Sequence, residues 1–179
     1  MKCFVVLLLL LLSTVALEAQ TKSQPITLRS AVPQPSQPNF AAITMDGTKV
    51  DTTAMRGKVI VVNLWFINCP HCREEITMLN QLVDQYNGKD VVFIGLAASK
   101  KADLVSFLAK NPFKYQVVPS AEMIMFSKFA TADSKGEVNI PFPMHYVLDR
   151  TGTVVVKAQG TAGIDAVKAE LAKQFATKP

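Results

Sequence analysis

The spacing of apolar and polar residues changes repeatedly from residue 58 onward. Apolar runs rich in β-branched residues are typical of strands, whereas apolar positions repeated every three or four residues are typical of helices. The predicted strands are Val59–Phe66, Val91–Ala97, Tyr115–Val118, Met144–Leu148 and Thr153–Ala158. The predicted helices are Pro70–Tyr86, Lys101–Lys110, Ala121–Ala130 and Ala162–Ala176. Strands that alternate with helices and end in a hairpin predict an α/β fold in three layers, with a mixed central β-sheet and helices on both faces.

The first residues of the chain have a different pattern. A basic residue, Lys2, precedes the apolar run Phe4–Leu12, and small residues follow as far as Ala19. This pattern predicts a secretory signal peptide over residues 1–19, which is removed from the mature protein. The alternative is an uncleaved membrane anchor, but the mostly apolar stretch of residues 4–17 is shorter than the roughly 20 residues that span a bilayer.

The segment that follows is polar and rich in proline. Residues 20–38 carry prolines at positions 25, 33, 35 and 38, which predicts an extended linker. Residues 39–179 then form one domain, and Phe40–Val50 is predicted to be a β-hairpin that turns at Asp46-Gly47.

Composition limits the classes of function. The chain is 49% apolar and 18% charged, which is enough for a packed core and excludes a disordered protein. Its 19 basic residues against 14 acidic ones give a net charge of +5 without a long run of one sign, so no nucleic-acid partner is predicted. Cys3 lies in the signal peptide, which leaves Cys69 and Cys72. A bridge across so short a loop adds little stability, so this pair needs another explanation.

The two cysteines lie where a predicted strand passes into a predicted helix. Pro70 suits the first helical position, where its missing N–H group costs nothing. Cys69 is then at the helix N-terminus, where free N–H groups and the helix dipole favour a thiolate. His71 adds a donor, or a positive charge when protonated, close to the same sulfur. These features predict thiol chemistry at Cys69.

A helical wheel separates the roles of the two sulfurs. Cys72 falls inside the apolar stripe of the helix and Cys69 at its edge, so Cys69 is predicted to be the accessible attacking thiol and Cys72 the shielded resolving thiol. Glu75 also falls inside the stripe, where its carboxyl group could exchange a proton with Cys72. The alternative, equally open at this stage, is that Glu75 reaches solvent or a lysine.

Over roughly residues 38–177 the sequence resembles the TlpA/ResA-like thiol–disulfide oxidoreductases of the thioredoxin superfamily. The resemblance rests on the hairpin, on Gly57-Lys58 before the first buried strand, and on Asn63-Leu64-Trp65 before the C-x-x-C motif. Glu75 matches an acidic residue that these proteins keep inside, and Pro141-Phe142-Pro143-Met144 matches their cis-proline loop.

The resemblance assigns further roles. It implies a thioredoxin-like fold with a redox-active disulfide between Cys69 and Cys72, and no bound cofactor or metal. It implies a cis bond before Pro143, with Phe142 and Met144 shaping the contact with a client chain.

Four other residues are predicted to be structural or to modulate the active site indirectly. Trp65 is expected to pack beneath the active-site loop, and His145 to be a packed or hydrogen-bonded histidine rather than a catalytic one. Met123 and Met125 are expected to fill the core beside the helix that contains them.

The implied function is an extracytoplasmic, monomeric thiol–disulfide oxidoreductase. Related proteins reduce disulfides in exported proteins such as apocytochrome c and are kept reduced by a membrane shuttle, so a reductase is expected here. Two departures stand out: Asn68 replaces a common second tryptophan, and Thr77 replaces a common helix-kinking proline. The Cys-Pro-His-Cys centre is similar to that of strongly oxidising DsbA-type proteins, which keeps a disulfide oxidase open as an alternative.

Three more alternatives differ in class. A copper chaperone on the same fold would use the two thiolates and a histidine, although such relatives usually have three residues between the cysteines. A thiol peroxidase would have threonine three residues before the reactive cysteine, where this chain has Phe66. A non-enzymatic binding module would leave the paired cysteines unexplained.

Overall fold

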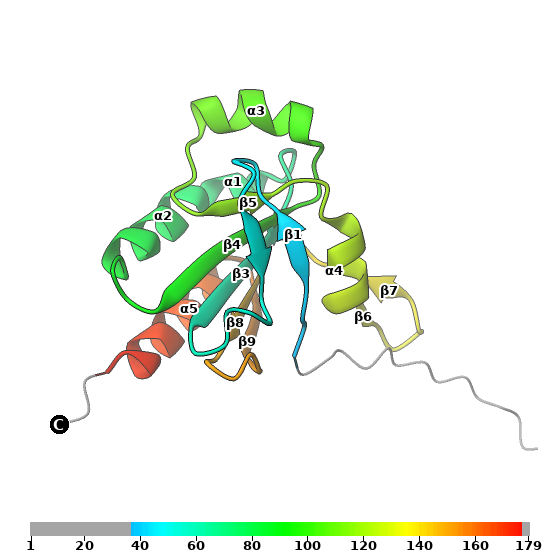
Figure 1. Cartoon of the computed structure of the whole chain (residues 1–179). Coiled ribbons are helices and arrows are strands. Elements are labelled where there is room, and N and C mark those ends of the chain that lie inside the picture. The colour runs from blue at the N-terminus through cyan, green and yellow to red at the C-terminus, as the bar shows by residue number, and fades with distance from the viewer. Residues whose placement is uncertain (1–36, 177–179) are drawn as a thin grey trace, which may run out of the picture.

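The central element of the computed structural model, which describes residues 37–176, is a five-stranded mixed sheet (Figure 1). Its strands lie in the order β5 (Gln116–Val118), β4 (Val91–Ala97), β3 (Val59–Trp65), β8 (Met144–Leu148) and β9 (Val154–Gln159). The middle strand, β3, pairs in parallel with β4 and antiparallel with β8, and all of its residues are buried. This burial explains its nearly unbroken apolar sequence. The predicted signal peptide lies outside the described residues, as does nearly all of the predicted linker.

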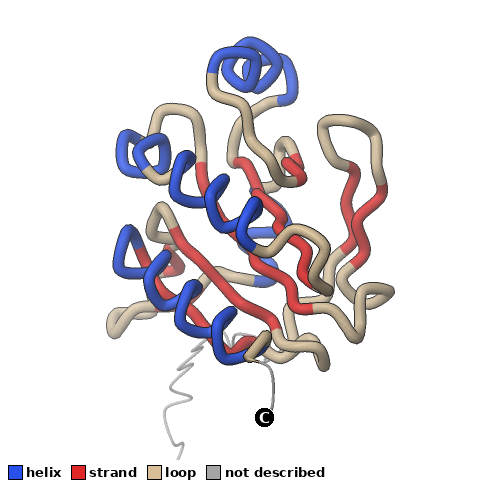
Figure 2. Tube along the Cα trace, turned by 90° about the vertical axis from the view of Figure 1, so that its left-hand side faces the viewer, coloured by secondary structure: helices blue, strands red, loops and turns tan. Residues whose placement is uncertain are grey.

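Helices cover both faces of the sheet, as predicted. On one face, α2 (Ile76–Gln85) and α5 (Gly160–Gln174) pack against alternate residues of β3, and Figure 2 shows them running side by side across the sheet. The other face is covered by α4 (Glu122–Lys128) and by the predicted N-terminal hairpin of β1 (Ala41–Ile43) and β2 (Lys49–Asp51). The remaining long helix, α3 (Lys101–Lys110), lies at one end of the sheet, where Leu104 packs with Trp65.

One predicted helix is two helices. The range Pro70–Tyr86 divides into α1 (Pro70–Glu74) and α2, with Glu75 between them. The backbone N–H group of Glu75 donates to the carbonyl of Arg73, not to the residue four positions back, so the helical hydrogen-bond ladder is interrupted there. The break lies two residues before Thr77, without a proline to cause it.

The region between α4 and β8 differs from the prediction in two ways. It contains a short hairpin of β6 (Thr131–Ala132) and β7 (Val138–Asn139), strands too short to produce a detectable apolar period. The expectation that both methionines of α4 fill the core is wrong for one of them. Met125 is 1% exposed, but Met123 is 78% exposed and points into solvent.

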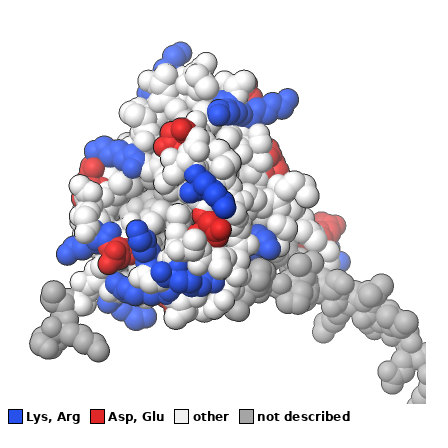
Figure 3. All heavy atoms as spheres, viewed as in Figure 1, with Lys and Arg blue, Asp and Glu red and all other residues white. Residues whose placement is uncertain are grey.

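Charged side chains of both signs occur on the surface. On the face seen in Figure 3, basic side chains lie beside acidic ones, and several basic ones gather near the lower edge of the view. Within residues 37–176, no helix has the length and apolar character needed to cross a membrane.

Candidate active site

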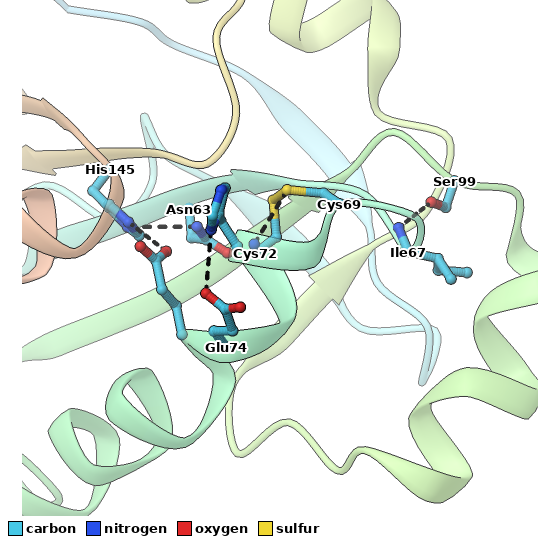
Figure 4. Close-up of a disulfide and its surroundings, with 9 residues drawn as sticks. Asn63, Ile67, Cys69, Cys72, Glu74, Ser99 and His145 are labelled. Carbon is cyan, nitrogen blue, oxygen red and sulfur yellow. Dashed lines mark hydrogen bonds and ion pairs between the residues drawn. A yellow bond between two sulfur atoms is a disulfide. The ribbon is translucent and has the colours of Figure 1, made fainter.

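Cys69 and Cys72 form a disulfide at the N-terminus of α1, where the chain leaves β3 (Figure 4). Cys69 is the N-cap residue and Pro70 follows at the start of the helix. The backbone N–H group of Cys72 donates to Sγ of Cys69 at 3.1 Å. A backbone donor directed at this sulfur would stabilise a negative charge on it once the disulfide opens.

The two cysteines do not differ in accessibility in the disulfide form. Cys69 is 5% exposed and Cys72 is 4% exposed, and both belong to an apolar cluster with Trp65 and Leu104. The helical wheel therefore predicted a difference that this form does not have, because residues outside the helix, Phe66 and Phe142 among them, also pack against the cluster that contains both cysteines. What distinguishes the sulfurs is the hydrogen bond that Cys69 accepts.

His71 lies on the surface, away from the apolar cluster. Its Nδ1 atom is 3.2 Å from Oε2 of Glu74, and the two side chains are 80% and 71% exposed. The structure therefore pairs His71 with Glu74, and its interaction with the Cys69 sulfur stays a prediction.

Trp65 lies beneath the active-site loop, as expected. It is 1% exposed, and its ring centroid is 4.6 Å from that of Phe113 and 5.7 Å from that of Phe107. Gly95 on β4 makes room for this packing, because a Cβ atom there would lie 3.0 Å from Nε1 of Trp65 and 2.9 Å from the ring of Tyr115. The floor of the site is thus a tightly packed aromatic layer.

Glu75 points into the protein and contacts His145, a residue of β8 that is 70 positions away in the chain. Oε2 of Glu75 is 3.0 Å from Nε2 of His145, and these side chains are 2% and 0% exposed. Nδ1 of His145 is 3.4 Å from Nδ2 of Asn63, which lies opposite it in the β3–β8 register (Figure 4). An Asn63 amide that donates to Nδ1 leaves Nε2 to carry a hydrogen and donate to Glu75. The partner of Glu75 is thus neither solvent nor a lysine.

The charge of Glu75 also acts on Tyr115. Burial raises the pKa of Tyr115 well above its ordinary value of 10.0, and the charge of Glu75 raises it further. In the part of the chain that the structure describes, the Tyr115 hydroxyl and Oε1 of Glu75 are buried without a hydrogen-bond partner. Sequence reasoning identified Glu75 but did not connect it with His145. The available signal was that Glu75 falls on the apolar stripe of its helix and that His145 is the polar residue of an apolar strand, so each needs a buried partner.

A glycine in α5 makes room for His145. A Cβ atom on Gly163 would lie 2.7 Å from Cδ2 of His145 and 3.0 Å from the carbonyl group of Ala158. Real Cβ atoms do not approach so closely, so α5 reaches the sheet at this point only because residue 163 has no side chain.

The cis-proline loop lies next to the disulfide. The Phe142–Pro143 peptide bond is cis, in agreement with the resemblance, and the Pro143 carbonyl accepts the N–H group of Gly160 at 3.1 Å. Phe142 is half-buried, and its ring meets that of Phe66 edge-on at 5.1 Å. Met144 is only 4% exposed and belongs to the core, so of the predicted client-contact residues it is Phe142 that offers side-chain surface.

Two sulfurs that can close on each other, one of them held against a backbone donor, provide what thiol–disulfide exchange requires. The protein is a thiol–disulfide oxidoreductase with a thioredoxin-like fold. The chain belongs to the AhpC/TSA family, whose model matches residues 34–157. The resemblance to ResA/TlpA-like proteins is confirmed by curated relatives, and the thioredoxin-like fold by solved structures.

Curated relatives from several Bacillus species are named thiol-disulfide oxidoreductase ResA. The protein from Bacillus thuringiensis is 29% identical over 129 residues, which covers 69% of this chain and 67% of the relative. The protein from Bacillus cereus is 26% identical over 124 residues, with the same coverage of both chains.

Many solved structures share the fold. A thiol:disulfide interchange protein of the thioredoxin family from Chlorobium tepidum superimposes with a TM-score of 0.61 at 21% identity, covering 75% of this chain and 93% of that one. A secreted disulfide oxidoreductase from Mycobacterium tuberculosis gives 0.59 at 21% identity, covering 76% and 96%.

Proposed function

We propose that the protein works outside the cytoplasm as a reductase of disulfides in exported proteins. The hydrogen bond from the Cys72 N–H group to Sγ of Cys69 carries the exchange chemistry of this proposal, because it selects Cys69 as the attacking thiolate. The reductase direction rests on the likeness to the relatives named ResA. The signal-peptide pattern of residues 1–19 supports the location. The relatives named thiol-disulfide oxidoreductase ResA support exchange with disulfides. Clients of the kind found in cytochrome c maturation are what the resemblance to ResA/TlpA-like proteins implies.

In the reduced enzyme, the Cys69 thiolate attacks one sulfur of a client disulfide. The client S–S bond breaks, a mixed disulfide forms, and the first client sulfur leaves as a thiolate. Cys72 then loses its proton and attacks Sγ of Cys69, which closes the Cys69–Cys72 disulfide and releases the second client thiolate. The enzyme gives the client two electrons, and the two client thiolates take up the proton that Cys72 releases and one proton from solvent. A membrane thiol-reducing shuttle then restores the reduced enzyme.

Glu75 is the group that we propose as the acceptor of the Cys72 proton. It lies three residues beyond Cys72, is buried, and is held by His145. Glu75→Gln keeps the size of the side chain but cannot take up the proton, so the pH dependence of client release is expected to change. Glu74→Gln, at the exposed neighbouring position, is the matched control and should leave the profile as it is. An identical profile for both variants would remove Glu75 from the mechanism.

The direction of electron flow is tested by the reduction potential. The N-terminus of α1 favours the Cys69 thiolate and raises the potential, whereas the nearby charge of Glu75 disfavours a second negative charge and lowers it. We expect a potential above that of thioredoxin, roughly −270 mV, but well below roughly −120 mV. Equilibration of the purified protein with glutathione buffers measures it. A value near −120 mV would make the protein an oxidase of the DsbA kind.

A further inference from the structure

A groove runs from the active-site loop toward the β6–β7 hairpin. Its first part is lined by the loop residues Phe66, Ile67 and Asn68, together with Ala98 and Glu122. Its second part shares Ala98 and Glu122 and continues between α4 and β7. Figure 1 shows α4 beside the β6–β7 hairpin. Because the two parts share these residues, they form one groove that starts beside the disulfide.

The part of this groove farther from the disulfide is apolar. Phe126, Val138, Ile140 and Phe142 line it, and its volume is about 230 Å³. A water molecule occupies roughly 30 Å³ in the liquid, so the space is large enough for an apolar side chain. Phe142 connects this part with the active site, because its ring also meets that of Phe66 and both rings pack against the apolar cluster that contains the two cysteines.

The rim of the groove carries exposed apolar side chains. Among residues 37–176, six large apolar side chains are exposed, and two of them line this part of the groove: Phe126 at 54% and Val138 at 49%. A third, Met123 at 78%, is on α4 beside Phe126. Met123 and Phe126 are three residues apart and so lie on the same face of α4. Exposed apolar side chains that gather around a groove mark a site of interaction rather than chance exposure.

We infer that this groove binds an extended apolar segment of the client protein, next to the client cysteine that undergoes exchange. The inference rests on the proposed function and names the part of the client that the enzyme recognises. A client must bring its sulfur to Cys69, so its chain passes over Phe66 and Phe142 at the mouth of the groove. A second copy of this chain bound in the groove would cover the disulfide and block exchange. A client bound there would instead bring its own cysteine to Cys69, as exchange requires.

The test uses two aspartate variants in the groove and a matched control for each. Phe126→Asp on α4 is compared with Val105→Asp on α3, where Val105 is 59% exposed and lies outside the groove. Val138→Asp on β7 is compared with Val155→Asp on β9, where Val155 is 40% exposed. Urea unfolding midpoints of all four proteins show whether each variant is folded.

Each protein is assayed with three disulfides: a peptide with leucine and phenylalanine beside its cysteine, the same peptide with serines instead, and oxidised glutathione. Both groove variants should lower the kcat/KM ratio of the apolar peptide to glutathione by about tenfold, the effect of losing one buried apolar contact. The two control variants should have the same ratio as the unchanged protein. For the serine peptide, the ratio of its kcat/KM to that of glutathione should differ little between groove variants and controls.

Equal ratios for groove variants and controls would overturn the inference while leaving the proposed function intact. An unchanged protein that exchanges with none of the three disulfides would instead overturn the proposed function. If Phe126→Asp converts a dimer to a monomer in size-exclusion chromatography without altering the ratio, the groove is a contact between copies of the chain and the inference is wrong.

Discussion

The buried pair of Glu75 and His145 allows a stability prediction that is independent of catalysis. His145→Leu keeps a side chain of similar size in the strand but removes the only hydrogen-bond partner that the described residues provide for the Glu75 carboxyl. Leaving a buried carboxylate without its hydrogen-bond donor costs about 3 kcal/mol, the upper end for an unsatisfied buried polar group, because this acceptor is charged. A domain of this size is stable by roughly 5–15 kcal/mol, so the loss is a large share of the total.

Replacing both partners should cost less than the two single changes suggest. In Glu75→Leu/His145→Leu, no buried charge is left, and apolar side chains of similar volume occupy the space. We expect a coupling free energy of about 1–3 kcal/mol between the two positions, because they are in direct contact.

Urea unfolding of the oxidised protein at pH 7 measures all four free energies. The urea dependence of the free energy should be the same for each variant, which checks that the unfolded states are comparable. A double variant that loses the sum of the two single losses would refute this reasoning, since Glu75 and His145 would then be independent.

Three other results are expected. Cys69→Ser should abolish exchange and Cys72→Ser should trap clients as mixed disulfides on gels; preferential alkylation of Cys72 in the reduced protein would reverse these roles. Tyr115→Phe should not lower the free energy of unfolding at pH 7, because it removes a buried hydroxyl without a partner. Since the pKa of Tyr115 is raised by burial, the unchanged protein should lose stability as the pH rises above 10.0, and this variant should lose less in alkaline urea titrations. Gly163→Ala should cost about 1–3 kcal/mol by crowding His145, as measured by thermal unfolding.

Much of the fold was predictable because the spacing of apolar residues along the chain indicates which side of each helix or strand is buried. The buried run of β3 and the pairing of β8 with β9 appear where the pattern placed them. The junction of strand and helix at Cys69 was predictable for the same reason, since Pro70 and the change of period both lie in one short stretch.

The apolar period did not predict the break at Glu75 or the partner of this residue, which is 70 positions away in the chain. The sequence can say that a buried carboxylate needs a partner, but it cannot say which one. That choice depends on the antiparallel register of β3 and β8, which sets His145 opposite Asn63 and above Glu75.

The sequence by itself determined the elements, their order and the position of the two cysteines, because these depend on residues close together in the chain. The tertiary structure decided the Glu75–His145 pair, the equal burial of the two cysteines and the groove between α4 and β7. Each of these brings together segments that are far apart in the chain. Their contacts depend on strand register and on the space left by Gly95 and Gly163, which no local period records.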